Sequence, residues 1–252
     1  MQWLRFFCLF LSLTASVRAA ALPVEQIVAK ALEKSEADEK NLTRFEYLQK
    51  VTFESLDSDG KPKEDGVSHL EMKVLPGEQT EFVVIGSGGK VTEEQQKQAR
   101  LSQKYKATFS LRKLEPRFLV RLDGTESWNG RPVLRLAFSP KPDQPYTNRV
   151  EKIANHLAGF MWLDAADYTL LRAKAHLAEP VAMAWILASM ESLNFAYEGC
   201  AVPGGSSSSS FEIDYRVAVL VGQLRQRNEI TMTDYREKVP TPTASQVSPM
   251  SQ

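Results

Sequence analysis

The sequence predicts an α+β protein in which a strongly curved antiparallel sheet of about ten strands, an incomplete β-barrel, is closed by helices. Three observations lead to this fold class. Many stretches of the chain alternate apolar and polar residues with period two, which is typical of half-buried strands. The connections between them are short and rich in Gly, Pro, Asn and Asp. Long helices do not separate the strands, so neighbouring strands are expected to pair with each other.

The first 21 residues have the pattern of a secretory signal peptide. Arg5 precedes the apolar run FFCLFLSLTASV, and the small residues Ala19-Ala20-Ala21 form a cleavage site. The run is shorter than the roughly 20 residues that a membrane-spanning helix needs. Cys8 lies inside it without a cleavage site beside it, which argues against a lipid anchor. We therefore expect an exported, soluble mature chain.

Composition excludes several classes of partner and cofactor. The chain has 31 Lys and Arg against 31 Asp and Glu, and loss of Arg5 and Arg18 with the signal peptide leaves it slightly acidic. Without a long basic run, nucleic acid is not an expected partner. Cys200 is the one cysteine left after export, so no internal disulfide forms, and we interpret it as a buried thiol. Residues 22–238 are long enough to form a single domain with its own core.

The amino-terminal part predicts one helix followed by a strand meander. Pro23 and the apolar residues Val24, Ile27, Val28 and Ala31 indicate an amphipathic helix over 23–40. Strands are predicted at 45–55, 67–75 and 81–86, the first two joined by the turn DSDGKPKEDG. Thr92 and Gln95 then form a capping box, which predicts a polar surface helix or flap over 92–104.

The second half predicts further hairpins. Asn129-Gly130 between two strand-like runs at 118–139 is the strongest short-range signal for a tight turn. A short helix is expected around 149–157, a hairpin over 159–177, and a second short helix over 178–188. A strand with Leu193, Phe195 and Tyr197 on one face leads to a flexible serine-rich loop at 199–210. Two long strands follow, and residues 239–252 are expected to form a disordered tail.

Asp164 and Asp167 raise the question of a catalytic carboxylate pair. Two carboxyl groups at suitable separation catalyse glycoside hydrolysis. Aspartate is also a favoured turn residue, because its side chain accepts hydrogen bonds from nearby backbone amides. No aromatic-flanked cleft is implied around the pair, so the turn role is the favoured interpretation.

No motif predicts a cofactor or a metal ion. The stretch IGSGGKVT lies where a phosphate-binding loop would lie, but Val84 and Val91 occupy positions that the motif requires to be Gly and Ser or Thr. The acidic turn after Ser55 lacks the glycine position and terminal Glu of a calcium loop. His69, His156 and His176 are scattered without zinc-ligand spacing.

Aromatic residues are spread over successive strands, and a curved open sheet with few helices has room for an apolar cavity. These residues are the candidates for ligand binding in such a cavity: Phe138, Phe160, Trp162, Trp185, Phe195 and Tyr197.

The order of elements resembles the LolA-like outer-membrane lipoprotein-sorting proteins. The resemblance rests on the signal peptide, the amino-terminal helix, the hairpin pattern with Gly159, Trp162, Asp164, Leu171 and Arg172, and the runs SWNGRPVLRLAFSPKP and IDYRVAVLVG. It implies a half-barrel with a hydrophobic cavity, located in the periplasm, in which better-known members carry lipoprotein acyl chains. Related proteins of this fold sense misplaced lipoproteins or bind other lipids. The resemblance transfers no individual functional residue.

Three hypotheses follow for the function. The first is a non-enzymatic carrier or binding protein for lipid or lipoprotein acyl chains. The second is a protein-interaction or envelope-sensor module of the same fold, which docks a membrane-protein partner without lipid cargo. The third is a hydrolase or transglycosylase that uses Asp164 and Asp167.

Overall fold

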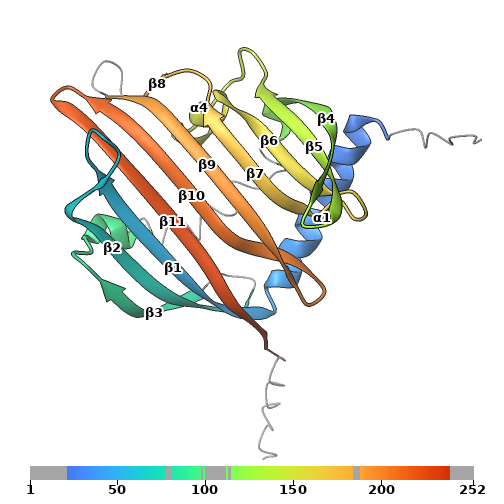
Figure 1. Ribbon diagram of the computed structural model, residues 1–252, viewed down its shortest axis with the longest axis horizontal. Coiled ribbons are helices and arrows are strands. Elements are labelled where there is room, and N and C mark those ends of the chain that lie inside the picture. Colours follow the sequence, from blue (N-terminus) through green and yellow to red (C-terminus); the bar gives the residue numbers. More distant parts are fainter. Residues whose placement is uncertain are drawn as a thin grey trace, which may run out of the picture.

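The computed structural model describes one antiparallel sheet with helices on one side of it (Figure 1), which confirms the predicted α+β class. The predicted signal peptide and tail lie outside the described residues. Those residues are 22–77, 81–97, 99, 112, 115–183 and 188–238. None of the helices among them is both long enough and apolar enough to cross a membrane.

The amino-terminal part consists of a helix and three strands. The helix confirms the prediction from apolar periodicity, and it ends two residues beyond the predicted boundary. The capping box is also present: the Thr92 amide donates to Gln95 Oε1 at 2.8 Å, and the Gln95 amide donates to Thr92 Oγ1 at 3.2 Å. The elements are α1 (Val24–Leu42), β1 (Phe45–Leu56), β2 (Pro62–Leu75) and β3 (Glu81–Gly88).

The remaining strands form a second, longer meander. Asn129 and Gly130 have φ angles of 51° and 77°, the left-handed values that a tight type I′ turn requires. The elements are the 3₁₀ turn Glu115–Arg117, β4 (Phe118–Trp128), β5 (Arg131–Pro140), α4 (Arg149–Ala154), β6 (Leu157–Asp164), β7 (Leu170–Leu177), β8 (Val181–Ala182), β9 (Ala188–Val202), β10 (Gly205–Val219) and β11 (Gly222–Glu237).

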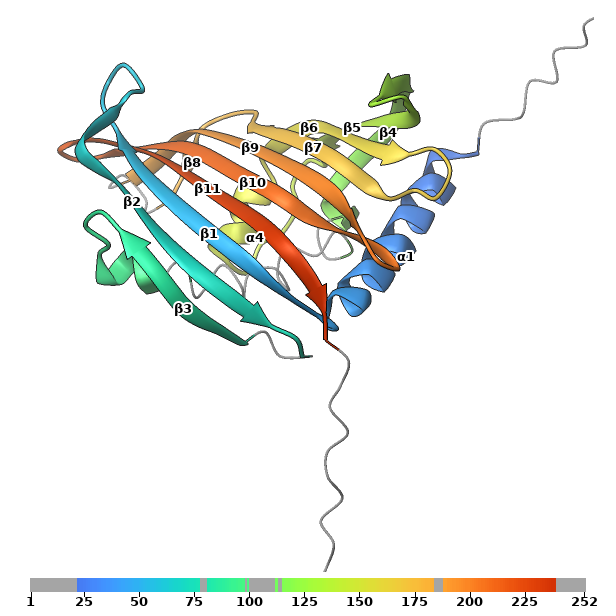
Figure 2. The same ribbon diagram turned by 60° about the horizontal axis from the view of Figure 1, so that its bottom comes forward.

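The two meanders join through a pairing between β1 and β11. The strand order is β3-β2-β1-β11-β10-β9-β7-β6-β5-β4, and the short β8 pairs with β9. The sheet has 11 strands among the described residues, and β3 and β4 form its two edges, so it does not close into a barrel. Figure 2 shows its curvature, with α1 beneath one end of the concave side.

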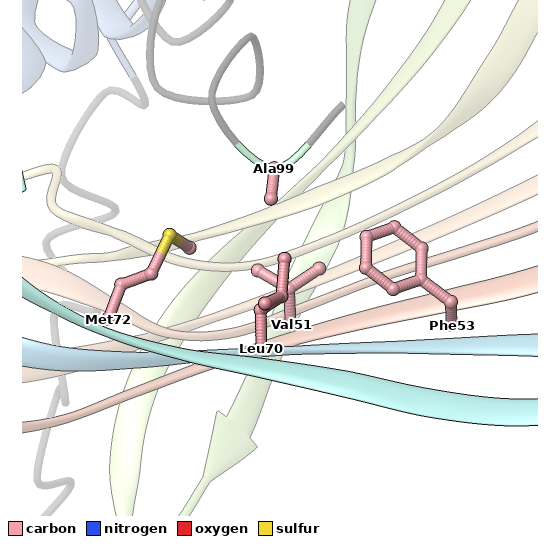
Figure 3. Packing of buried hydrophobic residues seen from close by; sticks show 5 residues of the cluster. All are labelled: Val51, Phe53, Leu70, Met72 and Ala99. Carbon is pink, nitrogen blue, oxygen red and sulfur yellow. The ribbon is translucent and has the colours of Figure 1, made fainter. Parts of the chain in front are cut away.

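We call the side of the sheet that α1 contacts the inner face. Ile27 of α1 packs against Leu136 of β5 and Leu163 of β6. At the other end, the inner face has a second core, in which Val51 and Phe53 of β1 and Leu70 and Met72 of β2 pack beneath Ala99 (Figure 3). The sheet is therefore covered on the inner face at both ends.

Polar contacts hold α1 against the turn between β9 and β10. Asp38 accepts hydrogen bonds from the amide and hydroxyl of Ser206, at 3.1 and 2.5 Å, and Asn41 donates to the carbonyl of Pro203 at 3.0 Å. The serine run was predicted to be a flexible loop, and this prediction is wrong. Residues 205–219 form β10, because Asp38 and the partner strands satisfy the serine backbone and side chains.

The prediction of a short helix over 178–188 is also wrong for the part that the structure describes. Val181 and Ala182 form β8, which pairs with Met190 and Ser189 of β9. Residues 184–187 lie outside the described residues. Pro180 directly precedes Val181, and it favours extended backbone at its own position and turns rather than a helix interior.

Candidate functional site: the inner face of the sheet

A row of apolar side chains crosses the inner face from one side of the sheet to the other. Strand register places these residues directly opposite one another on nine successive strands. In spatial order they are Leu122, Leu136, Met161, Ala173, Tyr197, Phe211, Ile230, Val51 and Leu70. Paired residues in a sheet point to the same side, so this row forms one continuous apolar surface.

The next row has small residues at its centre. It runs from Val120 of β4 to Phe53 of β1, with Gly159 and Ala175 on the middle strands. A side chain at Gly159 is impossible, because an added Cβ would lie 2.0 Å from the carbonyl oxygen of Lys174. The glycine therefore permits close approach of β6 and β7 rather than leaving space for a ligand.

Of the six aromatic residues predicted to line a cavity, the structure places three on the inner face. Phe138 packs edge-on against Phe118, with ring centroids 5.2 Å apart, and Phe195 packs in the same way against Phe211 at 4.8 Å. Tyr197 lies between Ala173 and Phe211 in the apolar row. Trp185 lies outside the described residues.

Phe160 and Trp162 lie on the opposite side, the outer face. They alternate along β6 with Gly159, Met161 and Leu163, which belong to the inner face, so they cannot line the same surface as Phe138. The structure therefore separates these two candidates from Phe138, Phe195 and Tyr197. The sequence alone could not assign them, because β6 is apolar on both faces.

Cations stabilise these two outer aromatic rings. The guanidinium of Arg135 lies 5.6 Å from the ring centre of Phe160, and that of Arg172 lies 5.3 Å from the ring of Trp162. The indole of Trp162 donates to Glu126 at 3.2 Å. Such contacts between cations and ring faces explain how large aromatic residues are accommodated on a surface that is otherwise charged.

Two inner-face tyrosines are neutral, hydrogen-bonded groups. Burial raises the pKa of Tyr197 to about 12, although a hydrogen bond with Ser208 acts in the opposite direction. Tyr235 donates to the carbonyl of Ser208 at 2.6 Å and accepts from Ser207 at 3.0 Å, and burial raises its pKa as well. The inner face therefore keeps these polar atoms paired and uncharged at neutral pH.

A pocket of about 240 Å³ opens on the inner face between β2, β3 and the helical residues that follow the capping box. Its lining consists of Leu70, Met72, Phe82, Val84, Ser87, Val91, Gln96 and Ala99. The sequence did not single out any of these residues for ligand binding, although it predicted the strands at 67–75 and 81–86. The sequence does not show where the helix after residue 92 docks, and this docking is what forms the pocket.

The outer face has a wider hollow of about 440 Å³, but its chemistry is different. Its walls combine the apolar residues Phe160, Ala175, Phe195 and Ala196 and the glycine Gly159 with four charged or polar side chains, those of Lys174, His176, Asn194 and Glu212. Charged and polar side chains on an open surface do not replace the water around an apolar ligand. The pocket on the inner face is therefore the better candidate for an apolar ligand.

Asp164 and Asp167 have the turn role that the sequence favoured. Asp164 Oδ1 accepts from the amide of Ala166 at 2.8 Å, and Asp167 Oδ1 accepts from the amide of Thr169 at 3.0 Å. Arg131 lies 3.8 Å from the other oxygen of Asp164. Each carboxylate thus orders the backbone between β6 and β7, and neither needs a catalytic role to explain its presence.

Cys200 lies half-buried on β9, and burial raises the pKa of its thiol. This shift is opposite to the one that activates a nucleophilic cysteine. Among the described residues, no three His, Cys, Asp or Glu side chains are grouped so that they could hold a metal ion.

The protein has an open, strongly curved antiparallel sheet with an apolar concave side and helices packed against it. This arrangement defines its structural class. Comparison with solved structures finds proteins of the family that the sequence resembles. A LolA superfamily protein from Nitrosomonas europaea is 9% identical over 87% of this chain and 95% of that chain, with a TM-score of 0.34. An outer membrane lipoprotein-sorting protein domain from Vibrio parahaemolyticus is 13% identical over 86% and 94%, with a TM-score of 0.41.

A third similar structure is that of the Pseudomonas aeruginosa MucA/MucB complex, in which a chain is 11% identical over 83% of this chain and 99% of that chain, with a TM-score of 0.27. No family model matches the chain, and no curated protein matches it. Because the identities do not exceed 13% and the TM-scores do not exceed 0.41, these structures identify no functional residue in this chain.

Proposed function

We propose that this chain is an exported, non-enzymatic binding or carrier protein that takes up acyl chains of lipids or lipoproteins on the inner face of its sheet. The proposal rests on the nine-residue apolar row and the pocket at its β2–β3 end. We infer that the protein works in the periplasm.

The energetics favour a hydrocarbon ligand. Each CH₂ group removed from water contributes about 0.8 kcal/mol, and most side chains that line the pocket are aliphatic or aromatic. A pocket of about 240 Å³ accommodates part of a long acyl chain. In the proposed complex, the remainder of the chain lies against half-buried residues of the apolar row, Ile230 on β11 and Phe211 on β10.

The rim of the pocket suggests the route of entry. Val84 of β3 lines the pocket and is also 46% exposed, so it connects the interior with solvent at the edge of the sheet. Gln96, on the helical segment above, is polar and exposed. A ligand that enters between these two residues places its hydrocarbon inside and its head group outside.

Two adjacent residues provide a matched test of this proposal. Val84 pairs with Met72 and belongs to the inner face, whereas Val83 pairs with Lys73 and points to the outer face. Val84→Trp should fill the pocket and reduce the affinity for long fatty acids by about tenfold or more, which corresponds to about 1.4 kcal/mol. Val83→Trp adds the same bulk outside and should leave the affinity unchanged.

Native mass spectrometry of the mature protein, followed by titration with fluorescent fatty acids, measures both effects. Bound lipid in the purified wild type, together with a selective loss in Val84→Trp, would support the proposal. A wild type that takes up no acyl chain, or equal binding by both variants, would contradict it.

The alternative function is a protein-interaction or envelope-sensor module without lipid cargo, whose partner would be an envelope membrane protein. The observation in its favour is β3, an edge strand with three consecutive exposed apolar residues, Val83, Val84 and Ile85. Exposed edge strands can pair with an extended segment of another protein. Under this alternative, Ile85→Pro should abolish capture of a partner that Leu119→Ser, on the other edge strand β4, still captures at the wild-type level.

A further inference from the structure

The turn between β10 and β11 is apolar and fully exposed. Leu220 and Val221 form the two-residue connection, and their side chains are 71% and 93% exposed. Val219 and Leu224, which flank the connection, are 44% and 45% exposed. Tight turns normally contain Gly, Asn, Asp or Ser, so four apolar residues here are not explained by turn formation. We call residues 219–224 the hairpin tip.

The hairpin tip extends beyond the neighbouring strand β1. The first residue of β11 that pairs with β1 is Gln226, opposite Ser55, and the residues of β11 before it pair with β10 alone. On the other side, β9 begins at Ala188, opposite Val219. Figures 1 and 2 show the β10–β11 connection at the far end of the sheet from the chain's last described residues. The tip is therefore a convex apolar projection rather than part of a groove or a flat face.

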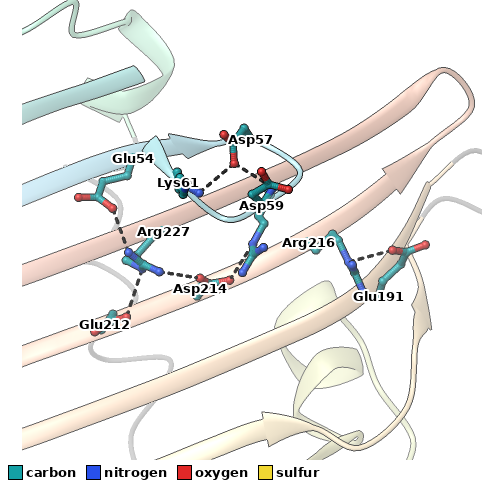
Figure 4. Close-up of polar contacts among 10 residues, drawn as sticks. Glu54, Asp57, Asp59, Lys61, Glu191, Glu212, Asp214, Arg216 and Arg227 are labelled. Atoms are coloured by element: carbon teal, nitrogen blue, oxygen red, sulfur yellow. Dashed lines mark hydrogen bonds and ion pairs between the residues drawn. The ribbon is translucent and has the colours of Figure 1, made fainter. Parts of the chain in front are cut away.

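Two arginines lie directly behind the tip. Arg216 of β10 and Arg225 of β11 are opposite each other in the register. Arg216 Nε lies 3.0 Å from Glu191 (Figure 4). Arg225 Nε lies 3.8 Å from Asp214. Like charges directly opposite each other in a sheet are destabilising. Each guanidinium has further N–H donors, which suit the oxygen atoms of a phosphate.

The spacing of these groups matches the depth profile of a membrane surface. Arg225 follows Val221 by four residues, which is about 13 Å along a strand at its usual rise. Apolar groups of interfacial proteins reach about 5–10 Å into the boundary between head groups and acyl chains. Leu220 and Val221 at that depth place Arg216 and Arg225 close to the level of the lipid phosphates.

We propose that the hairpin tip inserts into the surface of a lipid bilayer, with Leu220 and Val221 among the upper acyl-chain carbons and Arg216 and Arg225 at the phosphates. A protruding apolar tip fits a fluid bilayer, which closes around a convex shape, and the two ion-paired arginines behind it have further N–H donors for the lipid phosphates. This inference does not depend on acyl-chain binding in the inner-face pocket, because membrane contact involves the β10–β11 turn, whereas the pocket is formed by β2, β3 and the helical segment after residue 92.

The test is co-sedimentation of the full mature protein with vesicles of phosphatidylethanolamine and phosphatidylglycerol. The variant Leu220→Ser/Val221→Asn replaces the apolar connection by residues that suit a turn, so the hairpin should form as before. We expect the wild type to bind the vesicles and the double variant to lose more than about tenfold in affinity. Leu119→Ser is the matched control, since Leu119 is 55% exposed on the distant edge strand β4 and should bind as the wild type does.

A second measurement locates the tip directly. A polarity-sensitive fluorophore attached to Val221→Cys, in a Cys200→Ser background, should shift its emission to shorter wavelength when vesicles are added. A fluorophore on Leu119→Cys in the same background should not shift. No vesicle binding by the wild type, undiminished binding by the double variant, or an unshifted emission at position 221 would each overturn the inference. Fatty-acid uptake by Val84→Trp is read separately, so the failure of one proposal is distinguishable from the failure of the other.

Discussion

The two faces of the same sheet have opposite chemistry. Along β1, the side chains of Tyr47, Val51 and Phe53 are buried on the inner face. On the outer face, Glu54 of the same strand pairs with Arg227, which also pairs with Asp214 (Figure 4). Both faces are ordered by cross-strand contacts, but only one of them removes apolar surface from water.

This difference indicates where the stability of the fold comes from. Burial on the inner face contributes about 25 cal/mol per Å² of apolar surface. Partly exposed ion pairs on the outer face contribute little, with a median of about 0–1 kcal/mol each. The inner face should therefore control both stability and ligand binding, whereas the outer face should tolerate change.

The largest expected effect compares one residue type on the two faces. Phe53→Ala should lower the free energy of unfolding by about 3–5 kcal/mol, because the Phe53 side chain is only 2% exposed and leaves a cavity. Phe160→Ala on the outer face should cost about 1 kcal/mol or less. Urea unfolding followed by circular dichroism measures both. Equal losses would mean that the outer face contributes to stability as much as the inner face does.

The second effect concerns a buried hydroxyl of the inner face at alkaline pH. The folded-state pKa of Tyr197 is raised to about 12, so the unfolded chain ionises first and the free energy of unfolding falls as pH rises from about 10 to 12. At pH 12 the free energy of unfolding is therefore about 2 kcal/mol lower than it would be without this pKa shift. Tyr197→Phe removes it, so the stability of the variant relative to wild type should improve between pH 8 and pH 12. If the difference in stability between Tyr197→Phe and wild type did not change with pH, the Tyr197 hydroxyl would be exposed to solvent.

A third effect tests the contact of α1 with the sheet. Asp38→Ala removes the acceptor for the amide and hydroxyl of Ser206 and should cost about 1–2 kcal/mol. Glu36→Ala on the exposed side of the same helix serves as the control, with an expected change of about 0.5 kcal/mol or less. Thermal unfolding of both variants gives the comparison. A loss for Glu36→Ala as large as that for Asp38→Ala would contradict it.

The smallest effect is a pH dependence on the outer face. Burial raises the pKa of Asp123, but hydrogen bonds from Arg121 and Arg135, at 2.6 and 2.8 Å, outweigh it and hold the pKa below its usual value. Because a lowered carboxyl pKa stabilises the fold above the unfolded pKa, this stability is lost as pH falls below about 4. Asp123→Asn should therefore be less stable than wild type at neutral pH and should converge with it in acid. Parallel stability curves for the two proteins would contradict this assignment.

Local signals in the sequence were sufficient for most elements. Apolar periodicity identified α1, the Asn129-Gly130 pair identified the turn between β4 and β5, and Thr92 with Gln95 identified a helix start. In each case the cause lies within a few neighbouring residues. The alternation in β9 likewise placed Phe195 and Tyr197 on one face.

Features that depend on distant contacts were not predictable. The serine run becomes a strand because Asp38, 168 residues earlier in the chain, binds Ser206. The faces of Phe160 and Trp162 depend on which side of β6 faces α1, and an apolar pattern on both sides gives no answer. The β2–β3 pocket exists only because a helical segment docks over it.

The pairing of β1 with β11 has a consequence for how the chain acquires its structure. β1 is the first strand in the described part of the chain, and its hydrogen-bonding partner on one side, β11, is the last. Until β11 emerges, the amino-terminal meander has an open, unpaired side and lacks its connection to the rest of the sheet. Closing such a long loop is slow, and a nascent chain that stops before β11 leaves a template for intermolecular association. A shielding factor during synthesis, or late and concerted assembly, is the natural requirement of this topology.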